Sequence, residues 1–270
     1  MLRKIAPLLL TALLALTSCG SDRTTGLTPS SSEALSKAEL LSQKLLVSAY
    51  GQMNPSDHLL ELSQLNTENL RIQLNTDAKR LTFWINVYNA FIQFELRADT
   101  SLYSDRDAFF RNRNKKVAGQ TLSFSDIEHG ILRRNKELYS LGYFNKMNRS
   151  QASRDFAVER VDWRIHFALN CGAKSCPPVA YYRSDRLNEQ LNMATYNYLK
   201  KEIDLAKGKP EIPKLFLWFR ADFGGRKGIT KILQKFGGLE ESAAKSWKYK
   251  PYDWSIDLDK WYAPGELVNP

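Results

Sequence analysis

Residues 77–97 constrain the fold more than any other part of the sequence. The segment DAKRLTFWINVYNAFIQFELR is apolar nearly all round when it is drawn as a helix, which is typical of a helix buried in a core. Its polar exceptions recur every three or four residues and therefore form one narrow stripe. They are Thr82, Asn86, Asn89 and Gln93. The sequence thus predicts a central buried helix with a line of amides along one side.

Amides inside a core must be hydrogen-bonded, so this stripe has two interpretations. It ties down neighbouring loops, or it lines a site. Under the second interpretation Asn86 is a candidate binding residue. Asn89 is then a candidate catalytic group that orients a base or donates to an oxyanion.

Residues 163–178 concentrate the reactive side chains of the chain. The segment reads WRIHFALNCGAKSCPP and holds one of only three histidines and two of three cysteines. From Arg164 to Asn170 polar and apolar residues alternate, which predicts a strand with one face in the core. The other face carries Arg164, His166 and Asn170, of which Arg164 and Asn170 are candidate binding residues. A loop follows, and Pro177 could open a helix with Cys176 at its N-terminus.

The two cysteines allow three interpretations. Cys176 beside His166 is a candidate nucleophile with a general base, because a helix N-terminus and a histidine both favour the thiolate. Cys171 and Cys176 could instead form a disulfide in an oxidising compartment. Both could also be buried and inert.

The sequence predicts neither a metal nor a cofactor. Two cysteines and one histidine are too few for a closed zinc site, and a metal would need distant ligands such as His129 or Glu128. The triplet Asp-Phe-Gly at 222–224 lacks the loops that accompany it in kinases, so it indicates no metal site there.

Residues 121–134, TLSFSDIEHGILRR, predict a helix that carries two further candidate catalytic groups. Ser125 with Glu128 three residues later fits a capping box, and Ser123 could equally open the helix. Glu128 and the adjacent His129 would lie in its first turns. We expect them to orient the base or to donate to an oxyanion.

The N-terminus predicts export and lipid anchoring. Residues 1–18 combine two basic residues with an apolar run too short to span a membrane, as in a secretory signal peptide. The sequence Leu-Thr-Ser before Cys19 resembles a bacterial lipobox, in which the cysteine is acylated, for instance with palmitate. Residues 19–33 then form a flexible tether, and residues 34–270 form the globular domain. Gly20 favours the outer membrane if the source is Gram-negative.

The charge excess is spread along the chain. The net charge is +10, or +8 once the two basic residues of the signal peptide leave. An exported lipoprotein has little opportunity to meet nucleic acid, so no nucleic-acid partner is predicted. Modest affinity for an anionic surface or polymer is the expected consequence of this charge.

Shorter segments complete the predicted fold. Helical spacing of apolar residues predicts helices over residues 36–51, 56–74, 185–203 and 229–236. Short apolar runs predict strands over residues 214–219 and 252–258. Helices and strands do not alternate as in a parallel doubly wound fold. The predicted fold class is therefore α+β, a helix-rich single domain with a small antiparallel sheet.

Four segments resemble one family. FWINVYNA at 83–90, DIEHGILR at 126–133, RIHFALNCGAKSCPP at 164–178 and YDWSID at 252–257 are similar to the domain of unknown function 547 family, over about residues 65 to 257. The resemblance implies a globular domain found in exported bacterial proteins and, fused to helical partners, inside plant cells. It implies no activity. Because the cysteine motif also occurs in reducing compartments, the resemblance favours a nucleophile or a structural thiol over a disulfide alone.

Two hypotheses about function follow. In the first, Cys176 and His166 hydrolyse or transfer acyl groups of envelope peptides or polymers. In the second, the chain is a non-catalytic binding or scaffold module for a carbohydrate or a protein, with a structural disulfide or buried thiols. Its surface would then use the aromatic residues Trp247, Tyr249, Tyr252 and Trp254.

Overall fold

The structure is a computed structural model that describes residues 35–205, 208–263 and 267. The predicted signal peptide, the lipidation site Cys19 and the tether over residues 19–33 lie outside the described residues. Within the described part of the chain, no helix has the length and apolar character needed to cross a membrane.

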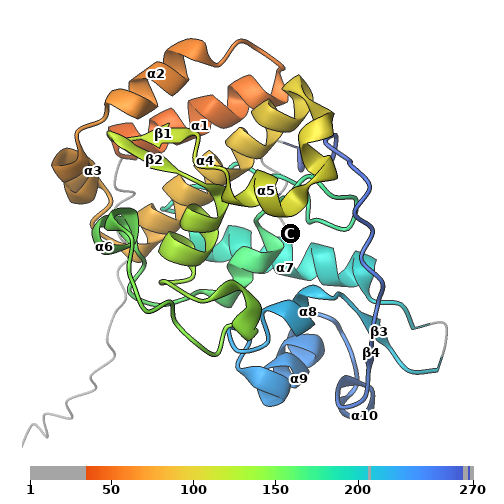
Figure 1. Ribbon diagram of the computed structural model, residues 1–270. Coiled ribbons are helices and arrows are strands. Elements are labelled where there is room, and N and C mark those ends of the chain that lie inside the picture. The colour runs from red at the N-terminus through yellow and green to blue at the C-terminus, as the bar shows by residue number, and fades with distance from the viewer. Residues whose placement is uncertain (1–34, 206–207, 264–266, 268–270) are drawn as a thin grey trace, which may run out of the picture. The chain divides into compact units, whose positions relative to one another are not determined.

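The centre of the fold is α4, Asp77–Ala98 (Figure 1). Thr76 opens it by accepting a hydrogen bond from the backbone of Lys79. All four residues of the predicted polar stripe are fully buried, as are most of the apolar residues around them. α1, Lys37–Tyr50, packs along α4 and starts with a capping box between Ser36 and Glu39. The predicted buried central helix is confirmed.

The segment predicted as one helix over residues 56–74 is two helices. They are α2, Ser56–Gln64, and α3, Thr67–Gln73. Leu65 leaves the helical conformation, and the side chain of Asn66 caps α3 by accepting from the backbone of Asn69. A good N-cap residue thus begins a second helix where apolar periodicity alone continues.

A hairpin and short helices follow α4. They are η1, Thr100–Ser104; α5, Arg106–Arg111; β1, Lys115–Val117; β2, Gln120–Leu122; η2, Asp126–Leu132; η3, Leu138–Ser140; and α6, Gln151–Phe156. β1 and β2 are antiparallel, with Lys115 opposite Leu122. Their turn places Ala118 and Gly119 at φ +49° and +73°, as a tight hairpin requires.

The predicted strand over residues 164–170 is wrong. The segment begins as a 3-10 helix, η4, Trp163–Phe167, opened by Asp162, whose carboxylate accepts from the backbone of Arg164. No parallel or antiparallel neighbour pairs with it among the described residues. Every residue from Ile165 to Asn170 is buried, so the alternation of polar and apolar residues in the sequence does not correspond to one buried and one open face.

The C-terminal part is mainly helical. It contains η4; α7, Leu187–Glu202; β3, Glu211–Ile212; α8, Leu215–Trp218; α9, Gly225–Lys235; α10, Glu241–Ala244; and β4, Lys248–Tyr249, which pairs in parallel with β3. The helix predicted over 185–203 is confirmed by α7. The strand predicted over 214–219 is wrong, because α8 occupies it, and the helix predicted from residue 229 begins earlier, at Gly225.

Residues 252–262 are here called the C-terminal strap, and residues 171–178 are called the cysteine loop. The strap runs back along the cysteine loop (Figure 1). The predicted strand over 252–258 is absent, since only isolated bridges form: Ala173 pairs with Ile256, and Val179 with Trp261. Backbone hydrogen bonds of 2.7–3.2 Å nevertheless fasten the strap along its length, including one from Lys174 N to the carbonyl of Ser255.

The helix-rich α+β class is confirmed, with two small two-stranded sheets, one of them antiparallel. A large apolar core surrounds α4. A second cluster of buried apolar residues lies under α7, α8 and α9, and Phe167 from η4 belongs to it.

Candidate functional site

A pocket of about 900 Å³, here called the cysteine pocket, gathers most of the predicted catalytic residues. Cys171 and Cys176, Glu128, His129 and His166 all line it. The rest of its wall is strongly aromatic and includes Tyr88, Phe110, Tyr139, Trp218, Phe219, Tyr252 and Trp254. Concave, mostly apolar pockets with a few titratable groups are typical of small-molecule sites.

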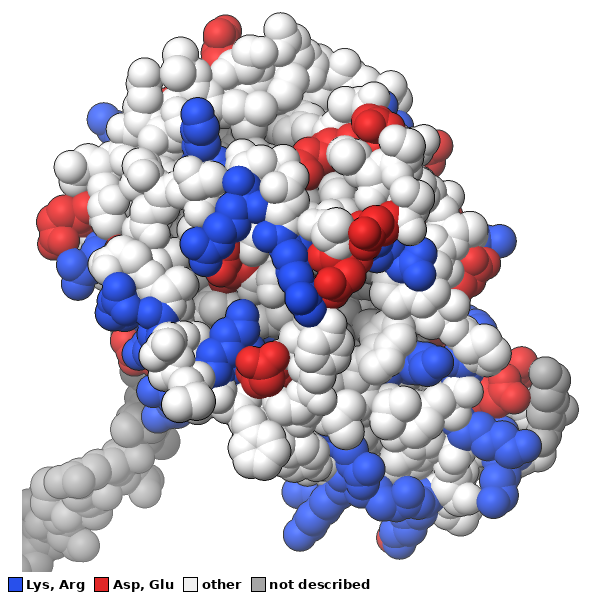
Figure 2. Space-filling view, in the orientation of Figure 1, with Lys and Arg blue, Asp and Glu red and all other residues white. Residues whose placement is uncertain are grey.

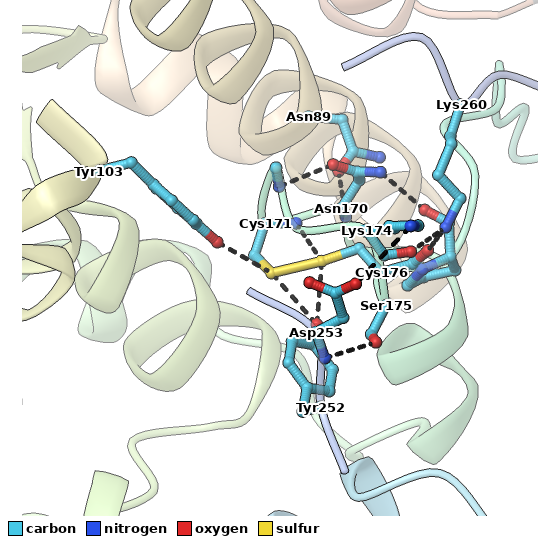
Figure 3. The surroundings of a disulfide bond; sticks show 12 residues. Asn89, Tyr103, Asn170, Cys171, Lys174, Ser175, Cys176, Tyr252, Asp253 and Lys260 are labelled. Atoms are coloured by element: carbon cyan, nitrogen blue, oxygen red, sulfur yellow. Dashed lines mark hydrogen bonds and ion pairs between the residues drawn. A yellow bond between two sulfur atoms is a disulfide. The ribbon is translucent and has the colours of Figure 1, made fainter. Parts of the chain in front are cut away.

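Cys171 and Cys176 are joined by a disulfide in the pocket wall (Figure 3). The hydroxyl of Tyr252 lies 3.1 Å from Cys176 Sγ and 3.4 Å from Cys171 Sγ. The backbone N–H of Cys171 also donates to Cys176 Sγ at 3.0 Å, and the Tyr103 hydroxyl donates to Cys171 Sγ at 3.8 Å. Cys176 is only 1 % exposed, whereas Cys171 is partly buried. The two sulfurs therefore differ in access and in hydrogen bonding.

The sequence predicted that Cys176 lies at a helix N-terminus, and this prediction is wrong. The chain after Pro177 is irregular, and the next helix, α7, begins only at Leu187. Stabilisation of a thiolate at Cys176 would therefore come from a hydroxyl and a backbone N–H rather than from a helix dipole.

The asparagines of the stripe hold the cysteine loop in place. Asn89 donates to the carbonyl of Ala168 at 2.9 Å and accepts from the backbone of Asn170 at 2.9 Å. Asn170 in turn donates to the carbonyl of Pro177 at 2.7 Å, and Asn86 exchanges two hydrogen bonds with the backbone of Tyr182. None of the three asparagines is among the residues that line the cysteine pocket. Their amides fix the backbone that carries the sulfurs.

His166 contacts Asp222 rather than a cysteine. Its Nε2 lies 2.9 Å from Asp222 Oδ2, both side chains are 1 % exposed, and its ring stacks on Phe219 with centroids 3.8 Å apart. Burial lowers the pKa of His166 to about 4, although the Asp222 hydrogen bond opposes this. The neutral ring therefore donates its Nε2–H to the carboxylate. In the described part of the chain no hydrogen bond joins either sulfur to a histidine, so the predicted Cys176–His166 contact is absent from this state.

A buried arginine links the two pocket histidines. Arg133 donates from Nε to Asp222 at 2.6 Å and from Nη1 to His129 Nδ1 at 2.9 Å, and it lies over the ring of Phe219. Burial and the Arg133 charge hold the pKa of His129 well below its usual value. Burial alone would raise the pKa of Asp222, but hydrogen bonds from His166 and Arg133 hold it at about 2. At neutral pH the cluster is a neutral histidine on each side of an arginine–carboxylate pair.

Glu128 lies on η2, which is a π-helix, a rare geometry that often marks functional sites. The predicted capping box of Ser125 and Glu128 is wrong: Ser123 and Asp126 exchange the hydrogen bonds that open this segment. Glu128 is thereby left to face the pocket, where it accepts from the Tyr88 hydroxyl at 3.3 Å. Burial raises the pKa of Glu128 to about 7, so it can hold or release a proton near neutrality.

Glu128→Gln is expected to flatten the pH dependence of stability. The folded pKa of Glu128 lies above its unfolded value. Its contribution to the free energy of unfolding is therefore fully present below about pH 4.5 and is lost as pH rises through about 7. We expect the wild type to lose about 1–3 kcal/mol more unfolding free energy than the variant between pH 5 and pH 8. Urea unfolding at the two pH values measures this difference. The exposed Glu61→Gln is the matched control, and equal pH dependence of Glu128→Gln and wild type would contradict the prediction.

Arg164 lies apart from the cysteine pocket. It donates to both carboxylate oxygens of Asp162 and to the side chains of Asn188 and Asn192. These residues line a second cleft that shares no lining residue with the cysteine pocket. Its predicted role in binding is therefore not connected with the sulfurs.

The sequence did not place several groups of this site beside the cysteines. Asp222 and Tyr252 come from distant segments, and Arg133 and Tyr88 lie within helical patterns that predict only packing. Tyr88, Arg133 and Tyr252 each fall in a segment that carries the family resemblance, and Tyr252 is also one of the predicted surface aromatic residues, but neither signal indicates a contact with the cysteines. Among the described residues, no cluster of histidine, cysteine, aspartate and glutamate has the arrangement of a metal site.

Residues 72–199 match the model of a family described as "Protein of unknown function, DUF547". The matched region holds both cysteines, both pocket histidines and Glu128, whereas Asp222 and Tyr252 lie beyond its end. No curated protein matches the chain, and no solved structure matches it.

Proposed function

For this chain, which matches the DUF547 family over residues 72–199, we propose a thiol–disulfide exchange function at the Cys171–Cys176 pair. One observation carries this proposal. The disulfide forms part of the wall of the cysteine pocket, and hydrogen-bond donors are directed at the sulfur of Cys176, the less accessible residue. An attacking thiolate needs an accessible sulfur and a leaving sulfur whose negative charge is stabilised. Cys171 and Cys176 fit these two roles.

The exchange proceeds in two displacements. A substrate thiolate attacks Cys171 Sγ; a new S–S bond forms to the substrate, the Cys171–Cys176 bond breaks, and the electron pair leaves on Cys176. A second substrate thiolate attacks the substrate sulfur of the mixed disulfide and releases Cys171. Two substrate thiols thus become one disulfide, and the protein disulfide becomes a dithiol. The reverse reaction oxidises the dithiol with a substrate disulfide.

Two pocket groups support this chemistry. Burial raises the pKa of Tyr252 far above neutrality, so its hydroxyl stays protonated and can donate to the Cys176 thiolate. Glu128 has a pKa of about 7 and lines the same pocket, so it can supply one of the protons that the dithiol takes up.

The test is the redox equilibrium of the full chain carrying Cys19→Ser, so that only the two pocket cysteines react. We expect a midpoint above about −300 mV in dithiothreitol buffers, because structural disulfides are usually more reducing than that. With Cys176→Ala added, Cys171 is expected to form a mixed disulfide with 5,5′-dithiobis(2-nitrobenzoate), detected by intact mass. With Cys171→Ala instead, Cys176 is expected to react at least about tenfold more slowly, because it is 1 % exposed.

The opposite results would assign a different role. A midpoint below that value, with both thiols unreactive until the chain unfolds, indicates a structural disulfide in a non-catalytic binding or scaffold module. Equal reactivity of the two single-cysteine variants contradicts the assignment of Cys171 as the attacked sulfur.

Thiol-dependent hydrolysis or acyl transfer is a second candidate, favoured by the hydrogen bond between His166 and Asp222. A carboxylate that fixes one ring nitrogen leaves the other to act as a base, as in catalytic triads. After reduction, the Cys176 thiol would pass its proton to His166, and the thiolate would attack an ester carbonyl. A C–S bond would form, the ester C–O bond would break, and the leaving alkoxide would take the proton from His166. Reduced chain treated with p-nitrophenyl acetate should then be acylated at Cys176 faster than N-acetylcysteine at the same pH. Loss of this difference in His166→Ala supports the candidate, and an equal rate for the wild type and N-acetylcysteine rejects it.

The N-terminal sequence supports a location in the cell envelope, lipid-anchored through Cys19 and in the outer membrane if the source is Gram-negative. Disulfides persist in exported compartments, and substrates there would be thiols or disulfides of envelope peptides, polymers or proteins. Incorporation of a palmitate analogue that is lost in Cys19→Ala tests the anchor.

A further inference from the structure

The second cleft, here called the α9 cleft, has a volume of about 740 Å³. It lies between the segment that leads into η4, the start of α7 and one side of α9. It is separate from the cysteine pocket, so the inference drawn from it does not depend on the proposed exchange function.

Three cations line the α9 cleft without acidic partners in the described part of the chain. Lys231 and Lys235 are four residues apart on α9, so they share one face of that helix, and Arg160 approaches from another segment. None of the three forms an ion pair there, and α9 itself contains no acidic residue. Figure 2 shows lysine and arginine side chains gathered at the lower edge of the molecule, in the region of α9.

The two acidic residues of the cleft are already neutralised. Asp77 pairs with Arg80 at 3.1 Å and accepts from the backbone N–H groups of Glu159 and Arg160. Asp162 pairs with Arg164 at 2.6 Å. The unpaired charge of the cleft is therefore positive.

Arg164 also fixes the orientation of two amides. Its Nη1 donates to Asn188 Oδ1 at 2.8 Å and to Asn192 Oδ1 at 2.7 Å. Because both amide oxygens are used, each asparagine has its Nδ2–H groups left as donors. Lysine, arginine and these amides together present hydrogen-bond donors, which suit an anion.

An aromatic wall completes the cleft. Trp163 is partly exposed, and its ring packs edge-on against Phe236 with centroids 5.7 Å apart. Both residues line the cleft. A partly exposed indole beside cations can pack against the flat face of a ring or a sugar.

We propose that the α9 cleft binds a small phosphorylated ligand that carries a ring, such as a sugar phosphate. Three cations exceed what one carboxylate needs, and they match a phosphate group with about two charges at neutral pH. The concave shape and the aromatic wall favour a discrete ligand over a flat anionic surface.

Isothermal titration of the full chain with glucose 1-phosphate and with pyrophosphate tests the proposal. We expect both to bind at low ionic strength, and both affinities to fall at least about tenfold in the triple variant Arg160→Ala, Lys231→Ala, Lys235→Ala. Lys231→Arg with Lys235→Arg should keep binding. Trp163→Leu should weaken glucose 1-phosphate more than pyrophosphate, which separates the ring contact from the charge contact.

The matched control removes three exposed lysines elsewhere: Lys44→Ala, Lys116→Ala and Lys200→Ala. It should leave both affinities unchanged, and the urea unfolding midpoint of every variant checks that it is folded. Equal loss in the control and the triple variant would overturn the proposal in favour of diffuse surface charge. Binding to vesicles of phosphatidylglycerol but to neither small phosphate would overturn it in favour of a membrane surface, and so would the absence of any binding.

Discussion

Replacing Asp222 by alanine is expected to lower the free energy of unfolding by about 3–5 kcal/mol. The side chain of Arg133 is fully buried, and Asp222 is the only carboxylate in the described chain with which it forms an ion pair. Without Asp222, the guanidinium stays in the core without a counter-charge, and His166 loses the acceptor of its Nε2–H. A buried charge left unpaired is among the largest single effects on protein stability.

Urea unfolding at pH 7 measures the loss of unfolding free energy in Asp222→Ala, and two further variants serve as comparisons. Asp222→Asn should cost less, because its amide oxygen can still accept from Arg133. Asp259→Ala removes an exposed carboxylate that also pairs with an arginine, Arg97, and should cost no more than about 1 kcal/mol. Since the folded pKa of Asp222 is about 2, its contribution to the free energy of unfolding should be present above about pH 4 and lost as pH falls toward 2. A loss in Asp222→Ala as small as in Asp259→Ala would show that Arg133 finds another partner.

Tyr252→Phe is expected to raise the pKa of the Cys176 thiol in the reduced protein by about one to two units. The hydroxyl lies within hydrogen-bond distance of both sulfurs, and a hydrogen bond to a charged group contributes about 1.5–3 kcal/mol. The same loss should shift the thiol–disulfide equilibrium about tenfold to a hundredfold toward the disulfide. Ultraviolet absorbance of the thiolate as a function of pH measures the first effect, and dithiothreitol buffers measure the second.

Tyr103→Phe is the matched control for Tyr252→Phe. Its hydroxyl contacts Cys171 alone, at the longer distance of 3.8 Å, so the pKa of Cys176 should barely move. Both variants keep the aromatic ring and its packing. Equal shifts in the two variants would indicate a general change in the pocket, and no shift in either would assign the stabilisation of Cys176 to the backbone N–H of Cys171.

The parts of the fold that could be predicted from sequence depend on contacts close along the chain. α4 follows from its apolar surface, and α7 from its helical spacing. Two residues of the amide stripe tie down loops, as one of the two interpretations predicted. Asn89 donates to the backbone of Ala168 before the cysteines, and Asn86 donates to the backbone of Tyr182 after them. The alternation of polar and apolar residues over 164–170 predicts a strand with one face in the core, but His166 and Asn170 are buried like their apolar neighbours because their side chains are hydrogen-bonded there. The pattern therefore could not identify the 3-10 helix η4.

The electrostatic part of the site could not be predicted because it joins distant segments. Asp222 is 56 residues from His166 and 89 from Arg133, and no periodic pattern connects them. Glu128 could be identified as a candidate, but its orientation depends on Asp126 taking the capping role and on a π-helical turn. Such choices are decided by tertiary packing rather than by local sequence.

The C-terminal strap determines how this protein can be divided. The family match ends at residue 199. Both Asp222, which pairs with Arg133, and Tyr252, which the strap brings to the disulfide, come after that residue in the sequence. A fragment cut at the family boundaries would keep both cysteines, but Arg133 would have no counter-ion and the cysteine loop would lose the backbone hydrogen bonds of the strap. A unit that is to report on this chemistry must therefore continue past the family match, through Asp222 and the strap to residue 262.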